Sequence, residues 1–349
     1  MKRKAQYISF SIPEFPIDII TYLCEYLPDK FKLDLLSASR TLHQFKKYVL
    51  FHEKVYTGFQ RRLQTEPINI IDPDLWYYDN FTNICTMSVT KFPSSMTSLE
   101  FYHAFNSEIK VGNIPSKVTY LKFGTDFNQL INPEVLPINL IILEFKEDSK
   151  FNQPIGKNVL PNQLVKLIFG NNFNQPIQLE VLPQSLRGLE FGNSFNQLIR
   201  PGVLPSGLVS LTFDSRSRFN QLIQPKVLPQ SLAYLQFGSR FNQQIQPGVL
   251  PSSLTILIFG YHFNQSIENL PPNIIDLEFG YMFNQSIKNC FGPNIHLLTF
   301  GTNFNQTLER KYIPESVMYI HLNNTRRINT DISSTIISGE NGFMILKLK

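Results

Sequence analysis

Residues 183–204, PQSLRGLEFGNSFNQLIRPGVL, are one unit of a repeat that occupies most of this sequence. The Phe-Asn pair of the unit occurs ten times, at steps of 20 to 24 residues, and a proline opens nearly every unit. Self-similarity at a fixed period of this size predicts stacked units that each contact only their neighbours. The pairs begin at residues 105, 127, 151, 173, 195, 219, 241, 263, 283 and 304.

The unit has the pattern of one coil of a solenoid. Leu-x-Phe-Gly at residues 189–192 alternates like a half-buried strand and ends in a residue that tolerates any turn. Proline at 201 and 205 excludes a helix on the return side. Two-residue insertions, in KEDSK (146–150) and DSRSR (214–218), fall between the strand and the next Phe-Asn pair and therefore indicate turns. The apolar positions of the unit are Leu186, Leu189, Phe191, Phe195, Ile199, Val203 and Leu204.

The Phe-Asn pair is predicted to be structural, because a ligand-binding role would require ten identical sites facing solvent. Rings at one angular position would stack into an internal column. The asparagine beside each ring would bend the chain and hydrogen-bond the backbone of the adjacent coil. We predict that both residues of the pair lie in the interior. The pairs are Phe127 and Asn128, Phe151 and Asn152, Phe173 and Asn174, Phe195 and Asn196, Phe219 and Asn220, Phe241 and Asn242, Phe263 and Asn264, Phe283 and Asn284, and Phe304 and Asn305.

Phe-Asn-Gln-x-Ile at this period resembles the FNIP repeat, from Pro93 to about Asn324. FNIP repeats are regarded as relatives of leucine-rich repeats, and Leu-x-x-Leu-x-Phe at 186–191 is similar to the strand of that family. The resemblance implies a curved solenoid of about ten to eleven coils with one parallel sheet. In this sequence the asparagine follows the strand two residues later than in leucine-rich repeats.

The positions where neighbouring units differ are the candidates for binding a partner. Side chains alternate along a strand, so the residues that flank the second leucine of each unit would point outward together. Eleven such rungs at about 4.8 Å would make a face roughly 50 Å long. These side chains either bind a target protein or pack on each other. The predicted target contacts are Tyr120, Lys122, Tyr234, Gln236, Ile256, Ile258 and Tyr319.

The sequence before the repeats changes to a helical period. FPIDIITYLCEYLPDK (15–30) carries apolar residues on one helical face, with Pro16 near its start and Pro28 at its end. A second helical run begins at about Asp29 and carries Leu33, Leu36, Leu42 and Phe45 on its apolar side.

This stretch resembles an F-box, with Phe15-Pro16 where that family has Leu-Pro, and with Ser39-Arg40 and Phe45 in its second half. An F-box followed by FNIP repeats is similar to a protein family of amoebae and of their large DNA viruses. The resemblance implies that the helices dock the Skp-type adaptor of a cullin-RING ubiquitin ligase while the array holds the target. The implied adaptor contacts are Phe15, Pro16, Ile19, Ile20, Leu23, Leu27 and Leu36.

Two functions therefore remain open: a substrate adaptor of a ubiquitin ligase, or an interaction scaffold whose N-terminal helices only cap the solenoid. Either reading predicts an α+β chain with four parts. These are an F-box-like module at 12–58, a linker and N-terminal cap at 59–92 that includes Trp76, repeats at 93–325, and a C-terminal cap at 326–349.

Composition and charge further limit the possible functions and partners of the protein. The net charge of +5 is spread over short pairs, which are typical of a solvated face and not of a nucleic-acid stripe. Cys24, Cys85 and Cys290 have no disulfide or zinc spacing, which fits a reducing compartment. There is no secretory leader pattern and no long apolar run. We expect a monomer outside the ligase complex, in the cytoplasm (the host's, if the chain is viral) or the nucleus, with no membrane partner.

An enzyme is not predicted. Asp276 and Glu278 share one outward strand face. Glu100, Glu144 and Glu190 lie on alternate rungs roughly 10 Å apart, which is too far for a retaining glycosidase pair and marginal for an inverting one. The six histidines form no local ligand pair. We expect no catalytic residue, no metal and no cofactor.

Overall fold

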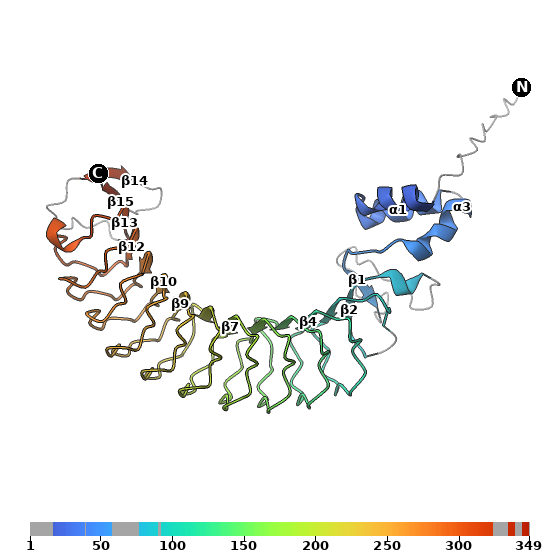
Figure 1. Cartoon of the computed structure of the whole chain (residues 1–349), viewed down its shortest axis with the longest axis horizontal. Helices are drawn as coiled ribbons and strands as arrows, with labels where there is room; N and C mark the ends of the chain where they lie inside the picture. The colour runs from blue at the N-terminus through green and yellow to red at the C-terminus, as the bar shows by residue number, and fades with distance from the viewer. Residues whose placement is uncertain are drawn as a thin grey trace, which may run out of the picture.

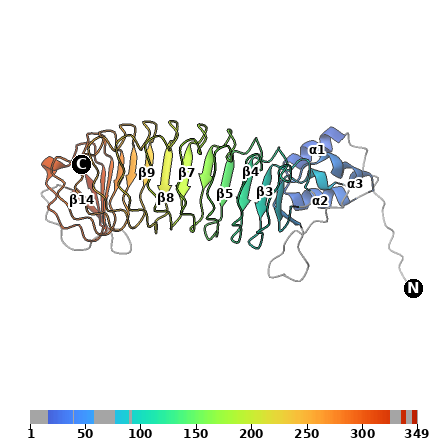
Figure 2. The same cartoon turned by 90° about the horizontal axis from the view of Figure 1, so that it is seen from below.

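The computed structural model describes residues 17–38, 40–57, 77–89, 92–323, 334–338 and 344–348. These residues form a curved solenoid with short helices at its N-terminal end (Figure 1). Seen from a perpendicular direction, the strands lie side by side as successive rungs (Figure 2). The predicted solenoid with coils of about 22 residues is confirmed. Phe15, Pro16 and Trp76 lie outside the described residues.

One 15-stranded sheet runs the length of the molecule in the order β1 to β13, then β15 and β14. Neighbours from β1 to β13 are parallel, whereas β15 is antiparallel to both β13 and β14. The strands are β1 (Val55–Thr57), β2 (Asn83–Thr86), β3 (Ser98–Phe101), β4 (Tyr120–Phe123), β5 (Ile142–Phe145), β6 (Lys166–Ile168), β7 (Gly188–Phe191), β8 (Ser210–Phe213), β9 (Tyr234–Gln236), β10 (Ile256–Ile258), β11 (Asp276–Glu278), β12 (Leu297–Phe300), β13 (Tyr319–Leu322), β14 (Ser334–Ser338) and β15 (Met344–Leu348).

The ends of the sheet differ from the sequence-based boundaries. The sheet begins with β1 and β2, two strands before the first repeat proline, Pro93. At the other end β15 pairs with β13, the last repeat strand. This pairing is antiparallel, which a two-strand addition can achieve without a further coil.

The N-terminal helices are α1 (Ile17–Glu25), α2 (Asp29–Ser37), α3 (Arg40–His43) and the 3-10 helix η1 (Gln44–Tyr48). Two further 3-10 turns are η2 (Tyr78–Asn80) and η3 (Arg310–Tyr312). The predicted second helical run is therefore broken into three pieces. Its start is held by a buried ion pair that sequence reasoning missed, between Lys32 and Asp29 at 2.8 Å. Asp29 also accepts the backbone N–H of Glu53 at 2.6 Å, which ties α2 to the segment that leads into β1.

Two interleaved columns of phenylalanine fill the solenoid. Every predicted Phe of the Phe-Asn pairs is buried, as is the Phe that ends each strand segment. Within one coil the rings of Phe191 and Phe195 stack at 3.8 Å between centroids, and Phe195 stacks on Phe219 of the next coil at 6.1 Å. Because each ring touches partners in its own coil and in both neighbours, the core is continuous along the array.

The predicted asparagine ladder is also present. From Asn106 to Asn305, each Oδ1 accepts the backbone N–H of the next Asn in the series at 2.8 to 3.0 Å. The glutamine of the motif joins it, as Gln197 Nε2 donates to both oxygens of Asn174. The placement of Asn174 in the interior was wrong: it is half-buried, while Phe173 is buried. The ladder therefore lies at the edge of the core, and its members Asn220 and Asn305, also predicted to be interior, are exposed.

The glycine after the strand has a different role from the one predicted. A Cβ on Gly192 would lie well under 3.0 Å from the carbonyl oxygen of Gly170 in the preceding coil. The residue is therefore required by close approach of two backbones. The left-handed conformation occurs at another turn, at Gly202 (φ 83°), where other coils tolerate Glu134 and Lys226.

The two inserted coils confirm that the insertions are turns. Lys146 and Asp214 replace the glycine in these coils, and the added residues place Ser149 and Ser217 in fully buried positions. Each serine hydroxyl accepts the backbone N–H of the following Phe, at 3.2 Å. The insertion thus supplies a side-chain hydrogen bond at a site where the shorter coils bring their backbones together.

Gly192→Ala is expected to destabilise the solenoid by about 1–3 kcal/mol, because the added methyl group forces two coils apart. Gly156→Ala is the matched control, since its Cβ would meet only Val159 Cγ2 at 3.8 Å. Urea unfolding followed by circular dichroism measures both. Equal midpoints for the two variants would contradict the close-approach explanation.

Asn174→Ala is expected to lower the unfolding midpoint, since it leaves the N–H of Asn196 without its acceptor, a loss of about 1–3 kcal/mol. Asn174→Asp keeps an oxygen at the same position and should retain most of the stability. The same urea titration compares them. If alanine and aspartate were equally destabilising, the hydrogen bond would not be the source of the effect.

Candidate protein-interaction surface

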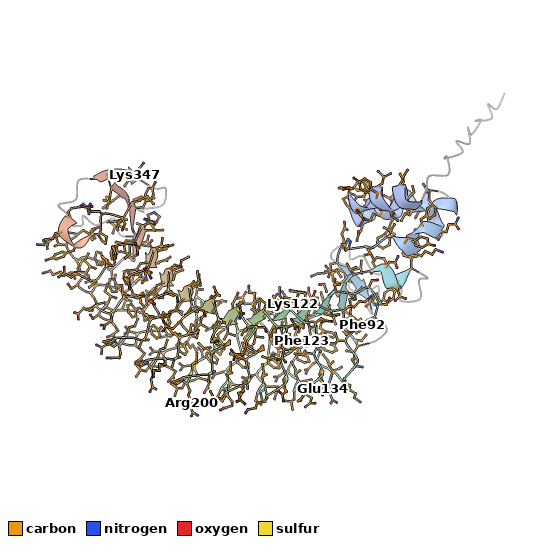
Figure 3. All side chains as sticks on the ribbon, viewed as in Figure 1. Phe92, Lys122, Phe123, Glu134, Arg200 and Lys347 are labelled. Carbon is orange, nitrogen blue, oxygen red and sulfur yellow. The ribbon has the colours of Figure 1, made fainter. Side chains whose placement is uncertain are left out.

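The sheet lines the concave side of the arc, and the turns form its convex side (Figure 1). Lys122 lies on the concave side, the neighbouring Phe123 points into the core, and Glu134 and Arg200 lie on the convex side (Figure 3). The residues that flank the buried leucine of each strand therefore point together onto the concave face, as the alternation predicts.

The predicted target contacts all lie on this face, but at three separate places. Tyr234 and Gln236 on β9 are in register with Ile256 and Ile258 on β10, so these four form one cluster. Tyr120 and Lys122 lie on β4, with four strands between them and that cluster, and Tyr319 lies on β13. The two isoleucines are half-buried, so they pack partly on their neighbours.

The N-terminal half of the face carries charges that are already paired. The Tyr120 hydroxyl donates to Glu144 at 2.7 Å, and Lys122 forms an ion pair with the same carboxylate at 2.5 Å. Burial, with the hydrogen bond to Glu144, raises the pKa of Tyr120 far above its usual range. Lys166 pairs with Glu190 in the same way, at 2.7 Å. A partner would have to break these pairs to gain a charge contact here.

The C-terminal half carries carboxylates without such partners. Asp276 and Glu278 flank the buried Leu277 on β11, beside the Ile256 and Ile258 strand. Neither forms an ion pair with any residue that the structure describes. Burial is the main cause that raises the pKa of both carboxyls, and for Glu278 the charge of Asp276 adds to it. Glu278 remains exposed to solvent, so its carboxylate is only partly desolvated by the concave sheet.

Asp276 and Glu278 are therefore candidate contact residues that were not in the predicted target set. They occupy the same outward strand positions as the predicted set, which was the available signal. In the sequence, Asp276 and Glu278 were considered only as a possible catalytic pair. The sheet register shows that the described strands beside β11 place no lysine opposite them. Bare carboxylates beside two isoleucines favour a partner with basic and apolar side chains.

The implied adaptor contacts on the helices divide into two groups. Ile20 and Leu36 are buried, and Leu27 is half-buried, so these three support the module from inside. Ile19 and Leu23 are 43% and 48% exposed, and the exposed Tyr22 and Tyr26 stack edge-on beside them. These four apolar or aromatic side chains, Ile19, Tyr22, Leu23 and Tyr26, are called the α1 patch below.

Nothing in the described part of the chain suggests an inorganic site. No group of three or more His, Cys, Asp or Glu residues there could hold a metal ion. Cys24, Cys85 and Cys290 are buried, unpaired thiols, and burial raises the pKa of Cys85 to about 12. Among the described helices, none has the length and apolarity to cross a membrane.

This geometry places the protein among leucine-rich-repeat-like solenoids, with the variable strand side chains on the concave sheet. Six segments of the chain match the FNIP Repeat family, at residues 89–126, 127–172, 173–215, 219–262, 263–291 and 283–325. They span more than half of the 349 residues, so this chain belongs to the FNIP repeat family. No F-box domain is detected.

Two solved structures were compared with this chain, and the first shares its solenoid architecture. The chain is 37% identical to CroV588, described as a novel circular LRR protein structure, with a TM-score of 0.70 over 83% of this chain. This chain spans only 45% of CroV588. An internalin (inlF) of Listeria monocytogenes is 13% identical, with 78% of this chain and 94% of that chain covered and a TM-score of 0.45. No curated protein matches the chain.

The raised carboxyl pKa values predict a pH effect on stability. A carboxyl whose pKa is higher in the folded state stabilises the fold at low pH, and this contribution is lost as pH rises through the folded pKa. Asp276→Asn/Glu278→Gln should therefore gain stability relative to wild type between about pH 4 and pH 7. Urea midpoints measured across that range test it.

Glu180→Gln is the control of opposite sign. The hydrogen bond and charge of Lys157 lower the pKa of Glu180, so the wild-type residue stabilises the fold above its unfolded pKa. This variant should show no gain relative to wild type as pH rises. A gain of equal size in both variants would mean that net charge, and not local burial, governs the effect.

Proposed function

We propose that this protein is a non-catalytic substrate adaptor with two contact surfaces, in which the concave sheet holds a target protein and the N-terminal helices bind a Skp-type adaptor of a cullin-RING ubiquitin ligase. The solenoid fold is consistent with a protein-interaction scaffold. The ligase assignment adds to that fold the F-box resemblance of residues 15–45 and the exposure of the α1 patch.

The observation that carries the proposal is that α1 is apolar on two sides. Ile20 and Cys24 face the core, which is all that a capping helix requires. Ile19 and Leu23 nevertheless remain exposed on the same helix, with Tyr22 and Tyr26 beside them. A contiguous exposed apolar patch marks a protein contact site in a folded protein. Phe31 on α2 is a further exposed aromatic side chain of the helical module, at 57%.

Capping and binding are compatible in this module. The buried residues of the helices and of the coils form a single hydrophobic core, running from Ile20 through Phe51 and Phe81 into the array. The helices therefore close the end of the solenoid. Their rigid attachment would hold a ligase adaptor at a fixed position relative to the concave face, which is the geometry that a substrate adaptor needs.

The target of the concave face follows from the side chains that remain unpaired. Ile256, Ile258, Asp276 and Glu278 lie on adjacent strands, with Tyr234 at the edge of the set. They match a target segment that carries basic residues next to aliphatic or aromatic ones. A ubiquitin role would place the protein with its ligase in the cytoplasm or the nucleus.

The alternative is a scaffold with no ubiquitin role, whose helices only cap the array. The continuity of the core through the helices favours it, because a cap alone would produce the same contacts. The exposed α1 patch distinguishes the two, since a cap gives that patch nothing to bind.

Ile19→Asp/Leu23→Asp is expected to reduce co-purification of a Skp-type adaptor at least tenfold, because two charges in an apolar interface lose several kcal/mol of binding. Both residues are exposed, so the unfolding midpoint should stay close to that of wild type. The matched control is Ile138→Asp, which makes the same change at an isoleucine that is 70% exposed on the solenoid.

Equal adaptor recovery with all three proteins, or no recovery with any, would defeat the ligase assignment and leave the scaffold. Crosslinking and mass spectrometry with wild type and Asp276→Asn/Glu278→Gln test the target surface separately. Loss of the same crosslinked protein in the double variant would support the concave face as the target site.

A further inference from the structure

A row of basic side chains lies on one lateral edge of the solenoid, away from the concave face. The residue that precedes the buried Phe of each coil occupies this edge. In three consecutive coils it is Arg218, Arg240 and His262, whereas the preceding coil has Ser194 and the following coil has Met282. The row is therefore local and not a consequence of the repeat.

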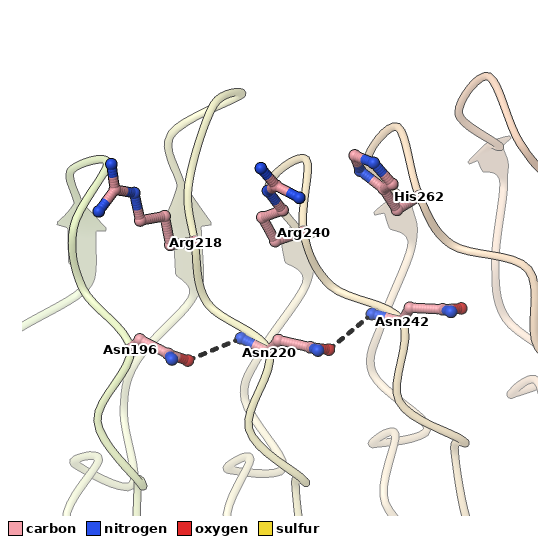
Figure 4. Close-up of a pocket in the computed structure, with 6 residues that line it drawn as sticks. All are labelled: Asn196, Arg218, Asn220, Arg240, Asn242 and His262. Atoms are coloured by element: carbon pink, nitrogen blue, oxygen red, sulfur yellow. Dashed lines mark hydrogen bonds between the residues drawn. The ribbon is translucent and has the colours of Figure 1, made fainter.

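These side chains overhang a groove of about 520 Å³ whose other residues belong to the asparagine ladder (Figure 4). Asn196 and Asn220 use their Oδ1 atoms for the ladder, each accepting from the next coil at 2.9 Å. Their amide nitrogens form no hydrogen bond with a described residue, so they remain as donors along the groove. The groove thus presents the amide N–H donors of the ladder and the positive charge of Arg218 and Arg240.

Among the described residues, no carboxylate pairs with Arg218 or Arg240. Lys150, at the equivalent position three coils before Arg218, is paired with Asp126 at 2.7 Å. Arg216, only two residues before Arg218, pairs with Glu147 and Asp214. Unpaired guanidinium groups beside a groove lined by donors are suited to carboxylate oxygens, which they bind in pairs.

The spacing between coils along the row matches the side-chain spacing of an extended peptide. Phe219, Phe241 and Phe263 directly follow Arg218, Arg240 and His262 in the sequence. The centroids of these successive rings are 6.1 Å apart at each step. Alternate side chains of an extended peptide project on one side at about 6.6–6.8 Å. The mismatch is under about 1 Å per step, which flexible arginine side chains can absorb.

We propose that this groove binds an extended acidic peptide segment, with carboxylates two residues apart placed on Arg218 and Arg240. The imidazole of His262 is held at the end of the row, since its Nδ1–H donates to the carbonyl oxygen of Ser239 at 2.8 Å. This site is independent of the concave face and of the ligase role.

A single-stranded nucleic acid is the competing ligand, because its phosphates also repeat along an extended chain. Such proteins combine a basic track with aromatic side chains on which bases stack. The groove residues include no Phe, Tyr or Trp, and the cationic row ends after three coils. The observations therefore favour the peptide, and RNA becomes an outcome of the test.

The test measures fluorescence anisotropy of a labelled peptide with glutamate at every second position, at low salt and at about 0.15 M salt. Arg218→Gln/Arg240→Gln should weaken binding of this peptide at least tenfold. Arg200→Gln/Lys226→Gln removes the same charge from the convex edge and should change it less than twofold. An identical peptide with glutamine in place of glutamate should not bind. Circular dichroism and urea unfolding check that both variants are folded.

Three results would overturn the proposal: no binding of the acidic peptide to wild type, equal weakening by both double variants, or tighter binding of an oligouridylate of similar length through the same arginines. The second result would mean that only net charge matters. The third would make the groove a nucleic-acid site.

Discussion

The stacking of phenylalanine rings between coils is the interaction on which the rest of this structure depends. Each ring is held at about 4 Å by its partner in the same coil and at about 6 Å by rings of the next coil. That spacing brings adjacent backbones so close that Gly192 cannot carry a Cβ, and it sets the distance across which one asparagine reaches the next. The core, the ladder and the glycine are three consequences of one coil-to-coil distance.

A core made of identical positions restricts function to the positions that vary. On the concave face the variation produces paired charges around β4 and unpaired carboxylates on β11. On the lateral edge it produces Arg218 and Arg240 over a groove lined by the ladder. The solenoid thus presents an acidic and apolar surface and a separate cationic one, while its N-terminal helices add an apolar patch. The repeat fixes the scaffold. The unpaired charges lie at repeat positions that vary between coils, and the apolar patch lies on the helices before the repeat.

Much of the fold could be read from the sequence, because the constraint that creates it repeats ten times. The coil length, the strand position, the turn insertions and the buried Phe column all follow from the spacing of Phe-Asn. The reading failed for features that have one copy or depend on a neighbour. Examples are the buried Asp29–Lys32 pair, the broken second helix, and the half-buried position of Asn174. The predicted target contacts reached the correct face, yet they scatter over β4, β9, β10 and β13.

The sequence by itself determined that the chain is a repeat array, which residues fill its interior and which strand positions face outward, because periodicity and side-chain alternation are local properties. Only the tertiary structure decided which outward side chains are free to bind. Glu144 is already held by Tyr120 and Lys122. Among the described residues, Asp276 and Glu278 form no ion pair, although the charge of His321 acts on Asp276, and Arg218 and Arg240 have no carboxylate partner. Pairing across neighbouring coils joins residues about 22 positions apart, so it depends on how coils register in space and not on the order of residues within a coil.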